Sequence, residues 1–129
     1  MRALFFTLFF TTYAFSQISI LISPKMKLKD ITQKDLANLY LKKVTHINGI
    51  KLIPVDNSNQ QIFHEFYQKI VKKTPEQLHA YWIKQIYHGK TKPPKRLSSA
   101  ALKNALKQNS YLIGYDKNPK TGKILMTIR

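Results

Sequence analysis

The segment from Pro54 to Gln60 contains the residues best suited to contact a ligand. It reads Pro-Val-Asp-Asn-Ser-Asn-Gln and joins an apolar stretch to a helical pattern. The first turn of a helix exposes unpaired backbone N–H groups and a partial positive charge, and both favour an anion. Ser58 and Asn59 can add side-chain donors. The same residues also suit an ordinary helix-capping turn, so the segment alone leaves both interpretations open.

The four histidines do not have catalytic or metal-binding spacing. His64-Glu65 lacks the second histidine of a zinc-protease helix, and His79 and His88 would point to opposite sides of one helix. The chain also has no cysteine, no Gly-x-Ser-x-Gly motif and no glycine-rich phosphate loop. The sequence therefore predicts no enzyme activity, no cofactor and no metal site.

Strands and helices alternate along the chain. Strands are expected at 18–23, 50–55, 111–115 and 123–128. Helices are expected from Thr32, from Asn57 or Ser58, from Thr74 and from Ser98 or Ser99, and residues 90–96 are expected to form a basic loop. This alternation predicts an α/β layer fold with a largely parallel sheet. On the helix after Thr74, we expect Leu78, Trp82 and Ile86 to share one buried face.

The charge is strongly unbalanced, with 22 Lys and Arg against 6 Asp and Glu, for a net charge of +16. The excess consists of 19 lysines and only three arginines, and the lysines are spread over the whole length. Arginine is the side chain best suited to bidentate recognition of phosphate groups and base edges. The composition therefore favours a general basic surface or attraction to anionic surfaces and ligands over nucleic-acid binding.

The first 16 residues have the pattern of a secretory signal peptide. Arg2 supplies a positive start, residues 3–10 are largely apolar, and Ala14 and Ser16 occupy the positions that a signal peptidase reads. The apolar run is shorter than the roughly 20 residues that span a bilayer. The sequence thus predicts a signal peptide at 1–16, a domain at 17–129 and a periplasmic location.

The second half of the chain carries a resemblance to a known family. Its blocks are Ile53-Pro54-Val55-Asp56, Phe63-His64-Glu65-Phe66-Tyr67, Ala80-Tyr81-Trp82, Gly89-Lys90-Thr91-Lys92-Pro93-Pro94 and Tyr111-Leu112-Ile113-Gly114-Tyr115. In this order and spacing they resemble small single-lobe relatives of the phosphate-binding proteins that serve bacterial ABC transporters. The resemblance implies a three-layer α/β domain like one lobe of a type II periplasmic binding protein.

The resemblance also implies a ligand-binding site at Asp56, Asn57, Ser58, Asn59 and Gln60. Asp56 matches an aspartate of the family and Ser58 matches a serine. Pro54 stands where the family has an arginine, and Asn59 and Gln60 replace a glycine and a threonine. Loss of the arginine removes a charge-assisted contact. An exposed Asp56 would repel an anion unless it accepted a proton from it, so hydrogen phosphate is expected over sulfate.

Two functions follow from these observations. The first is an exported solute-binding domain that binds phosphate or another oxyanion weakly, in transport or sensing, because 129 residues suffice for only one of the family's two lobes. The alternative is a basic interaction module that docks on a membrane transporter or sensor protein without a small ligand. A 56–60 turn that lies in an open concavity with free N–H groups favours the first, and a covered turn favours the second.

The signal-peptide interpretation predicts that the mature protein begins at Gln17. Intact-mass measurement of the protein recovered from an exporting cell checks this. A mass that still includes residues 1–16 would instead indicate a retained membrane anchor.

Overall fold

The computed structural model describes residues 17–119 and 122–129, and the expected signal peptide lies outside these residues. The strands are β1 (Ile18–Ile22), β2 (His46–Ile47), β3 (Ile50–Lys51), β4 (Ile53–Asn57), β5 (Lys95–Leu97), β6 (Leu112–Lys117) and β7 (Lys123–Ile128). The helices are α1 (Gln33–Tyr40), α2 (Gln60–Phe66), the π-helix η1 (Tyr67–Val71), α3 (Pro75–Tyr87) and α4 (Ser99–Gln108). Strands and helices alternate as expected, but the strand expected at 50–55 is divided into β3 and β4, and the short strands β2 and β5 were not expected.

Five of the seven described strands form one sheet, in the order β5-β4-β6-β1-β7. β4 runs parallel to both β5 and β6, whereas β1 runs antiparallel to both β6 and β7. The expectation of a largely parallel sheet was therefore wrong, because the sheet is mixed. A helix between two strands implies that the strands are parallel only when the two strands are neighbours in the sheet. The connection from β1 to β4 does not meet this condition, because β6 lies between them.

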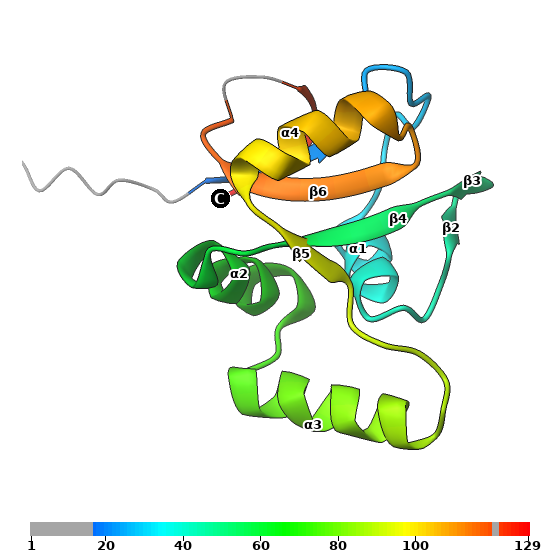
Figure 1. The fold of residues 1–129 in the computed structure, drawn as a ribbon, viewed down its shortest axis with the longest axis vertical. Coiled ribbons are helices and arrows are strands. Elements are labelled where there is room, and N and C mark those ends of the chain that lie inside the picture. Colours follow the sequence, from blue (N-terminus) through cyan, green and yellow to red (C-terminus); the bar gives the residue numbers. More distant parts are fainter. Residues whose placement is uncertain (1–16, 120–121) are drawn as a thin grey trace, which may run out of the picture.

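The sheet is covered by helices on both faces, which gives three layers (Figure 1). One face packs against α1, α2 and η1, and its largest fully buried side chains include Tyr40, Phe66 and Tyr115. The other face packs against α4, where Leu102 and Leu106 meet apolar side chains of the sheet. The α/β three-layer architecture expected from the sequence is confirmed.

Side chains cap the helix starts. Thr32 and Asp35 form a capping box at α1, and Thr74 and Gln77 form another at α3, where Pro75 occupies the first helical position. Such reciprocal bonds satisfy backbone N–H groups that have no helical partner. They explain why these two starts could be located from the sequence.

Helix α3 lies at one end of the molecule, beside the rest of the core (Figure 1). Leu78 and Trp82 are buried, as expected, and the Tyr81 hydroxyl donates to the backbone carbonyl of Leu41 at 2.7 Å. Ile86, however, is 57% exposed, so its predicted burial was wrong. The buried stripe of α3 is narrow because only one side of this helix meets the core.

Trp82→Ala is expected to lower the free energy of unfolding by about 3 kcal/mol, because it removes a large side chain from the junction between α3 and the core. Tyr87→Ala is the control on the same helix: its side chain is 86% exposed, and its effect should stay within about 0.5 kcal/mol. Urea denaturation measures both. Equal stability of the two variants would contradict the packing of α3.

Candidate functional site

The predicted site lies where β4 ends and α2 begins. β5 runs beside β4, with Asp56 opposite Arg96 and Asn57 opposite Leu97. Helices start directly after both strands, α2 after β4 and α4 after β5. The N–H of Ser58 donates to the carbonyl of Leu97 at 2.9 Å and joins the two strand ends. The carboxyl ends of parallel strands are where open α/β sheets bind ligands.

Asp56 points into the protein. It is 3% exposed, and its two carboxylate oxygens accept hydrogen bonds from the hydroxyls of Tyr67 and Tyr115, each at 2.9 Å. Tyr67 belongs to η1 and Tyr115 to β6, so the carboxylate joins three segments that are distant in sequence. A buried carboxylate needs such donors, because burying it without hydrogen bonds costs several kcal/mol.

Aromatic side chains enclose this group. The rings of Phe66 and Tyr115 are stacked, with centroids 3.8 Å apart and planes 4° from parallel. The Tyr40 hydroxyl lies 3.0 Å from the carbonyl of Val55 and 3.1 Å from that of Ile113, so it links α1 to both β4 and β6. These rings shield Asp56 from water.

The apolar surroundings shift the ionisation of the group. Burial raises the pKa of Asp56 from 3.8 to about 7, although the hydrogen bonds from Tyr67 and Tyr115 and the charges of Arg96 and Lys42 lower it. Burial also raises the pKa values of Tyr67 and Tyr115, and the nearby Asp56 carboxylate raises them further. Both tyrosines therefore keep their hydroxyl protons near neutral pH.

Asn57 is also turned inward and is 1% exposed. Its side-chain amide donates to the carbonyl of Tyr115 at 3.1 Å, and its side-chain oxygen accepts from the N–H of Asn59 at 2.9 Å. The structure thus gives Asp56 and Asn57 protein partners, whereas Ser58, Asn59 and Gln60 are exposed. The five predicted residues are close together but face two different environments.

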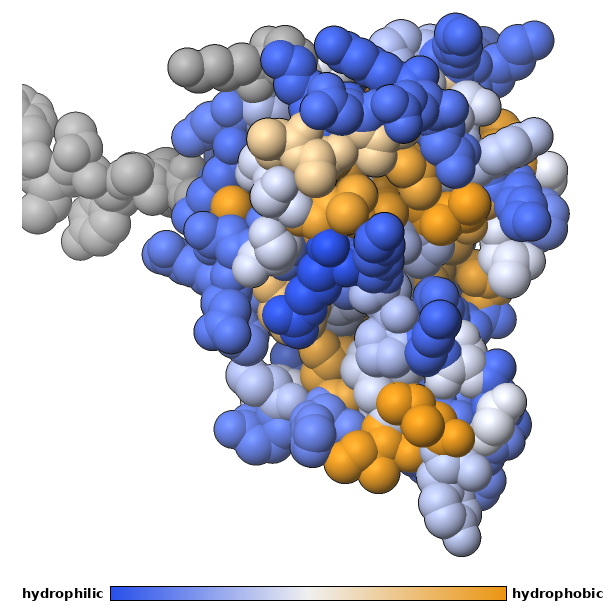
Figure 2. Space-filling model, in the orientation of Figure 1, coloured by the Kyte–Doolittle hydropathy of each residue, from blue (hydrophilic) through white to orange (hydrophobic). Residues whose placement is uncertain are grey.

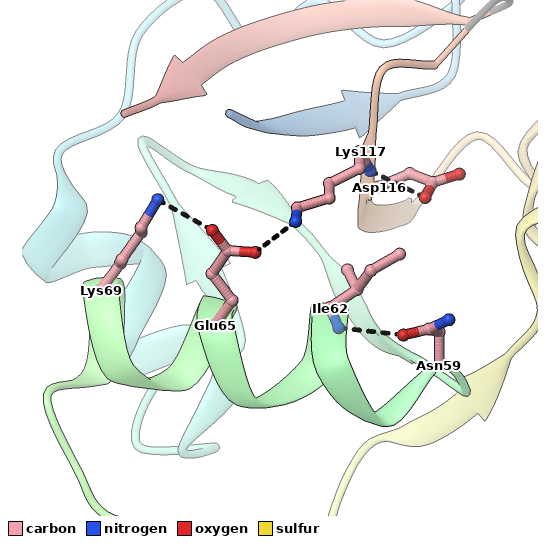
Figure 3. Close-up of polar contacts among 6 residues, drawn as sticks. All are labelled: Asn59, Ile62, Glu65, Lys69, Asp116 and Lys117. Atoms are coloured by element: carbon pink, nitrogen blue, oxygen red, sulfur yellow. Dashed lines mark hydrogen bonds and ion pairs between the residues drawn. The ribbon is translucent and has the colours of Figure 1, made fainter. Parts of the chain in front are cut away.

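The exposed half of the turn is the start of α2. Asn59, and not Asn57 or Ser58 as expected, is the N-cap, and its side-chain oxygen accepts from the N–H of Ile62 at 3.1 Å (Figure 3). In this described part of the chain, the first-turn N–H groups of Gln60 and Gln61 have no preceding helical carbonyl and remain for solvent or a ligand. Because α2 continues into η1, the helical segment behind them extends to Val71.

Arg96 is a functional candidate that the sequence prediction missed. Its guanidinium carbon lies 3.8 Å from the centroid of the Phe63 ring, which places the cation against the first turns of α2. The predicted basic loop contains the short strand β5, and pairing with β4 brings Arg96 to this position. The scarcity of arginine was the available signal, because Arg96 is the only one between Arg2 and Arg129.

Two further cations, Lys69 and Lys117, lie on the side of α2. Glu65 makes ion pairs with Lys69 at 3.1 Å and with Lys117 at 3.0 Å (Figure 3). Lys117 ends β6, so this carboxylate links α2 to the sheet. Its negative charge offsets part of the lysine charge near α2.

Two pockets lie elsewhere on the molecule. One, of about 450 Å³, is lined by residues that include Leu21, Ser99, Lys103 and Lys107. The other, of about 440 Å³, lies between η1 and the start of α3. Neither of these two pockets includes a residue of the 56–60 turn. In the described ranges, His, Asp and Glu side chains do not gather into a group that could bind a metal ion.

Two solved structures have a similar fold. A Clostridium perfringens protein described as a phosphate ABC transporter substrate-binding protein, solved with bound phosphate, matches with a TM-score of 0.59 and 18% identity, over 82% of this chain and 42% of that one. An ABC-type phosphate transport receptor from Vibrio cholerae matches with a TM-score of 0.53 and 12% identity, over 85% of this chain and 46% of that one.

These matches confirm the expected fold, which is that of a single lobe of such a binding protein. The chain spans less than half the length of either structure. No family model matches the sequence, and no curated protein is similar to it in sequence. Among residues 17–119 and 122–129, no helix has the length and apolar content needed to cross a bilayer.

The raised pKa of Asp56 predicts a specific dependence of stability on pH. Between about pH 4 and pH 7 the folded state holds a proton on Asp56 that the unfolded chain has lost, so stability should fall as the pH rises through this window. A shift from 3.8 to about 7 corresponds to a loss of up to about 4 kcal/mol.

Asp56→Asn removes this contribution. Denaturant unfolding at about pH 5 and about pH 8 should show a larger loss of stability in the parent protein than in the variant. Other carboxylates titrate equally in both proteins and cancel in the comparison. The same loss in both proteins would contradict a buried Asp56 that binds its proton tightly.

Proposed function

We propose that this chain is an exported, non-enzymatic solute-binding domain that holds phosphate or a related oxyanion at the start of α2, in transport or sensing. The observation that carries the proposal is the exposed first turn of α2 beside Arg96, at the carboxyl ends of β4 and β5. The fold supports it, because the similar structures include one described with bound phosphate.

The proposed contacts are fewer than the sequence predicted. The N–H groups of Gln60 and Gln61 and the Ser58 hydroxyl are the donors, and Arg96 supplies the positive charge that is missing at Pro54. Asn59 holds the turn through its bond to Ile62. These groups lie on an open surface, so binding is expected to be weak and sensitive to salt.

Asp56 has a different role in this proposal. Both of its oxygens are occupied by tyrosine hydroxyls inside the core. A proton on the ligand therefore does not meet Asp56, and the expected preference for hydrogen phosphate over sulfate loses its basis. Selectivity should instead follow the charge of the anion, with the more highly charged form binding better.

Arg96→Gln should weaken phosphate binding about fivefold, which corresponds to about 1 kcal/mol for a solvent-exposed charge contact. Lys95→Gln is the matched control: it removes the same charge from the adjacent residue, whose side chain points to the opposite face of β5. Titration with inorganic phosphate, followed by amide chemical shifts, measures both. In the parent protein, saturable shifts should centre on Ser58, Gln60 and Gln61.

The control separates a site from general electrostatics. Equal weakening by both substitutions, or shifts spread over the lysine-rich surface and abolished by moderate salt, would count against the site. Either result would move support to the alternative, a basic module that docks on a membrane transporter or sensor protein without a small ligand.

A further inference from the structure

Helix α3 carries an exposed apolar face. Ile83 and Ile86 are 54% and 57% exposed, and Tyr87 is 86% exposed. At about 100° per residue these three side chains lie together on one side of the helix, next to the stripe that buries Leu78 and Trp82. Figure 2 shows hydrophobic atoms gathered on α3, at the end of the molecule, with hydrophilic surface around them. We call these three residues the α3 face.

The surroundings of the α3 face are basic. Lys84 lies within the helix, and Lys90 and Lys92 follow its end; all three are exposed. Helix α3 carries one acidic residue, Glu76 in its first turn, at the end of the helix away from these lysines. Apolar side chains bordered by lysines are typical of helices that lie on anionic lipid surfaces. An exposed tyrosine next to them suits the level of the headgroups.

Charge and size argue against other occupants of this face. A second copy of the chain would bring another +16 charge against the same lysines. A stable protein interface buries about 800 Å² on each partner and involves about 20 residues or more, whereas the α3 face has three large side chains on a helix that protrudes (Figure 1). A bilayer surface accepts a small convex contact of this kind, because lysine attraction adds to shallow insertion.

We propose that the α3 face docks on a membrane surface that contains anionic phospholipid. Ile83, Ile86 and Tyr87 enter the interfacial region, and Lys84, Lys90 and Lys92 contact phosphate groups of the lipid. The start of α2 and the α3 face use different residues, so this docking is independent of the proposed oxyanion site. Docking through the α3 face keeps the basic solute-binding domain close to a membrane.

The absence of cysteine allows a local test in the full chain. An environment-sensitive dye is attached at His88→Cys, beside the α3 face, or at Gln108→Cys on α4, and both positions are exposed. Vesicles of phosphatidylcholine, with or without phosphatidylglycerol, are added. The dye at position 88 should shift to shorter wavelength only with phosphatidylglycerol, and the dye at position 108 should not shift. Both variants contain residues 1–16, so membrane binding by that segment alone would not give a shift specific to position 88.

Substitutions test the apolar contribution. Ile83→Ser with Ile86→Ser should reduce the vesicle affinity reported at position 88 by about tenfold or more. Ile53→Ser with Ile124→Ser is the matched control, because both are exposed isoleucines away from α3, and it should leave the affinity unchanged. Thermal unfolding confirms that each variant is folded.

Four results would overturn the proposal. They are no shift at position 88 on anionic vesicles, equal shifts at positions 88 and 108, equal weakening by the two isoleucine pairs, and a concentration-dependent dimer that the α3 substitutions abolish. The third would show that the loss of affinity is not specific to α3. The last would assign the face to a second copy of the chain.

Discussion

The arrangement of this protein depends on one buried carboxylate. Asp56 is removed from water, so its oxygens must find donors within the chain, and the hydroxyls of Tyr67 and Tyr115 supply them. The three residues come from β4, η1 and β6, which makes the group a junction between the sheet and the helical segment that follows the turn. Phe66, stacked on Tyr115, closes the junction from the side. The direction in which the chain leaves β4 follows from these contacts.

That direction determines what the surface can offer. With Asp56 and Asn57 held inward, the chain turns outward at Ser58, and the first N–H groups of α2 face solvent. The parallel pairing of β5 with β4 then brings Arg96 over Phe63, beside the same turn. The proposed site therefore combines backbone donors with one arginine, and the carboxylate is bonded within the fold. The α3 face is separate from this arrangement, because α3 contacts the core through only one side.

Local signals in the sequence were enough for several elements. The starts of α1 and α3 were predicted because Thr32 with Asp35, and Thr74 with Gln77, satisfy each other three residues apart. The cap of α2 was misplaced by one or two residues, because the carbonyl of Tyr115, distant in sequence, holds the side chain of Asn57. β5 was missed for a similar reason: a three-residue strand after two prolines is defined by its partner β4 and not by its own pattern.

The candidate site was predicted only in part. Ser58, Asn59 and Gln60 lie at an exposed helix start, as the capping pattern indicated. The role of Asp56 could not be derived, because its partners lie 11 and 59 residues further along the chain. The antiparallel direction of β1 and the position of Arg96 beside β4 also depend on pairing between strands that are distant in sequence. Pairing between distant strands leaves no local pattern in the sequence, so it could not be predicted from one sequence.

The central claim is that Asp56 is an internal structural carboxylate and that any bound anion stays outside it. A pH titration of the Asp56 carboxyl carbon by carbon-13 NMR, with and without phosphate, tests this most directly. The account predicts a midpoint at about 7, since the tyrosine hydroxyls separate the carboxyl from solvent, and at most a small upward shift with phosphate, as the anion offsets the charge of Arg96. A midpoint near the ordinary value of 3.8, with or without phosphate, would show that Asp56 is open to solvent and would contradict the account.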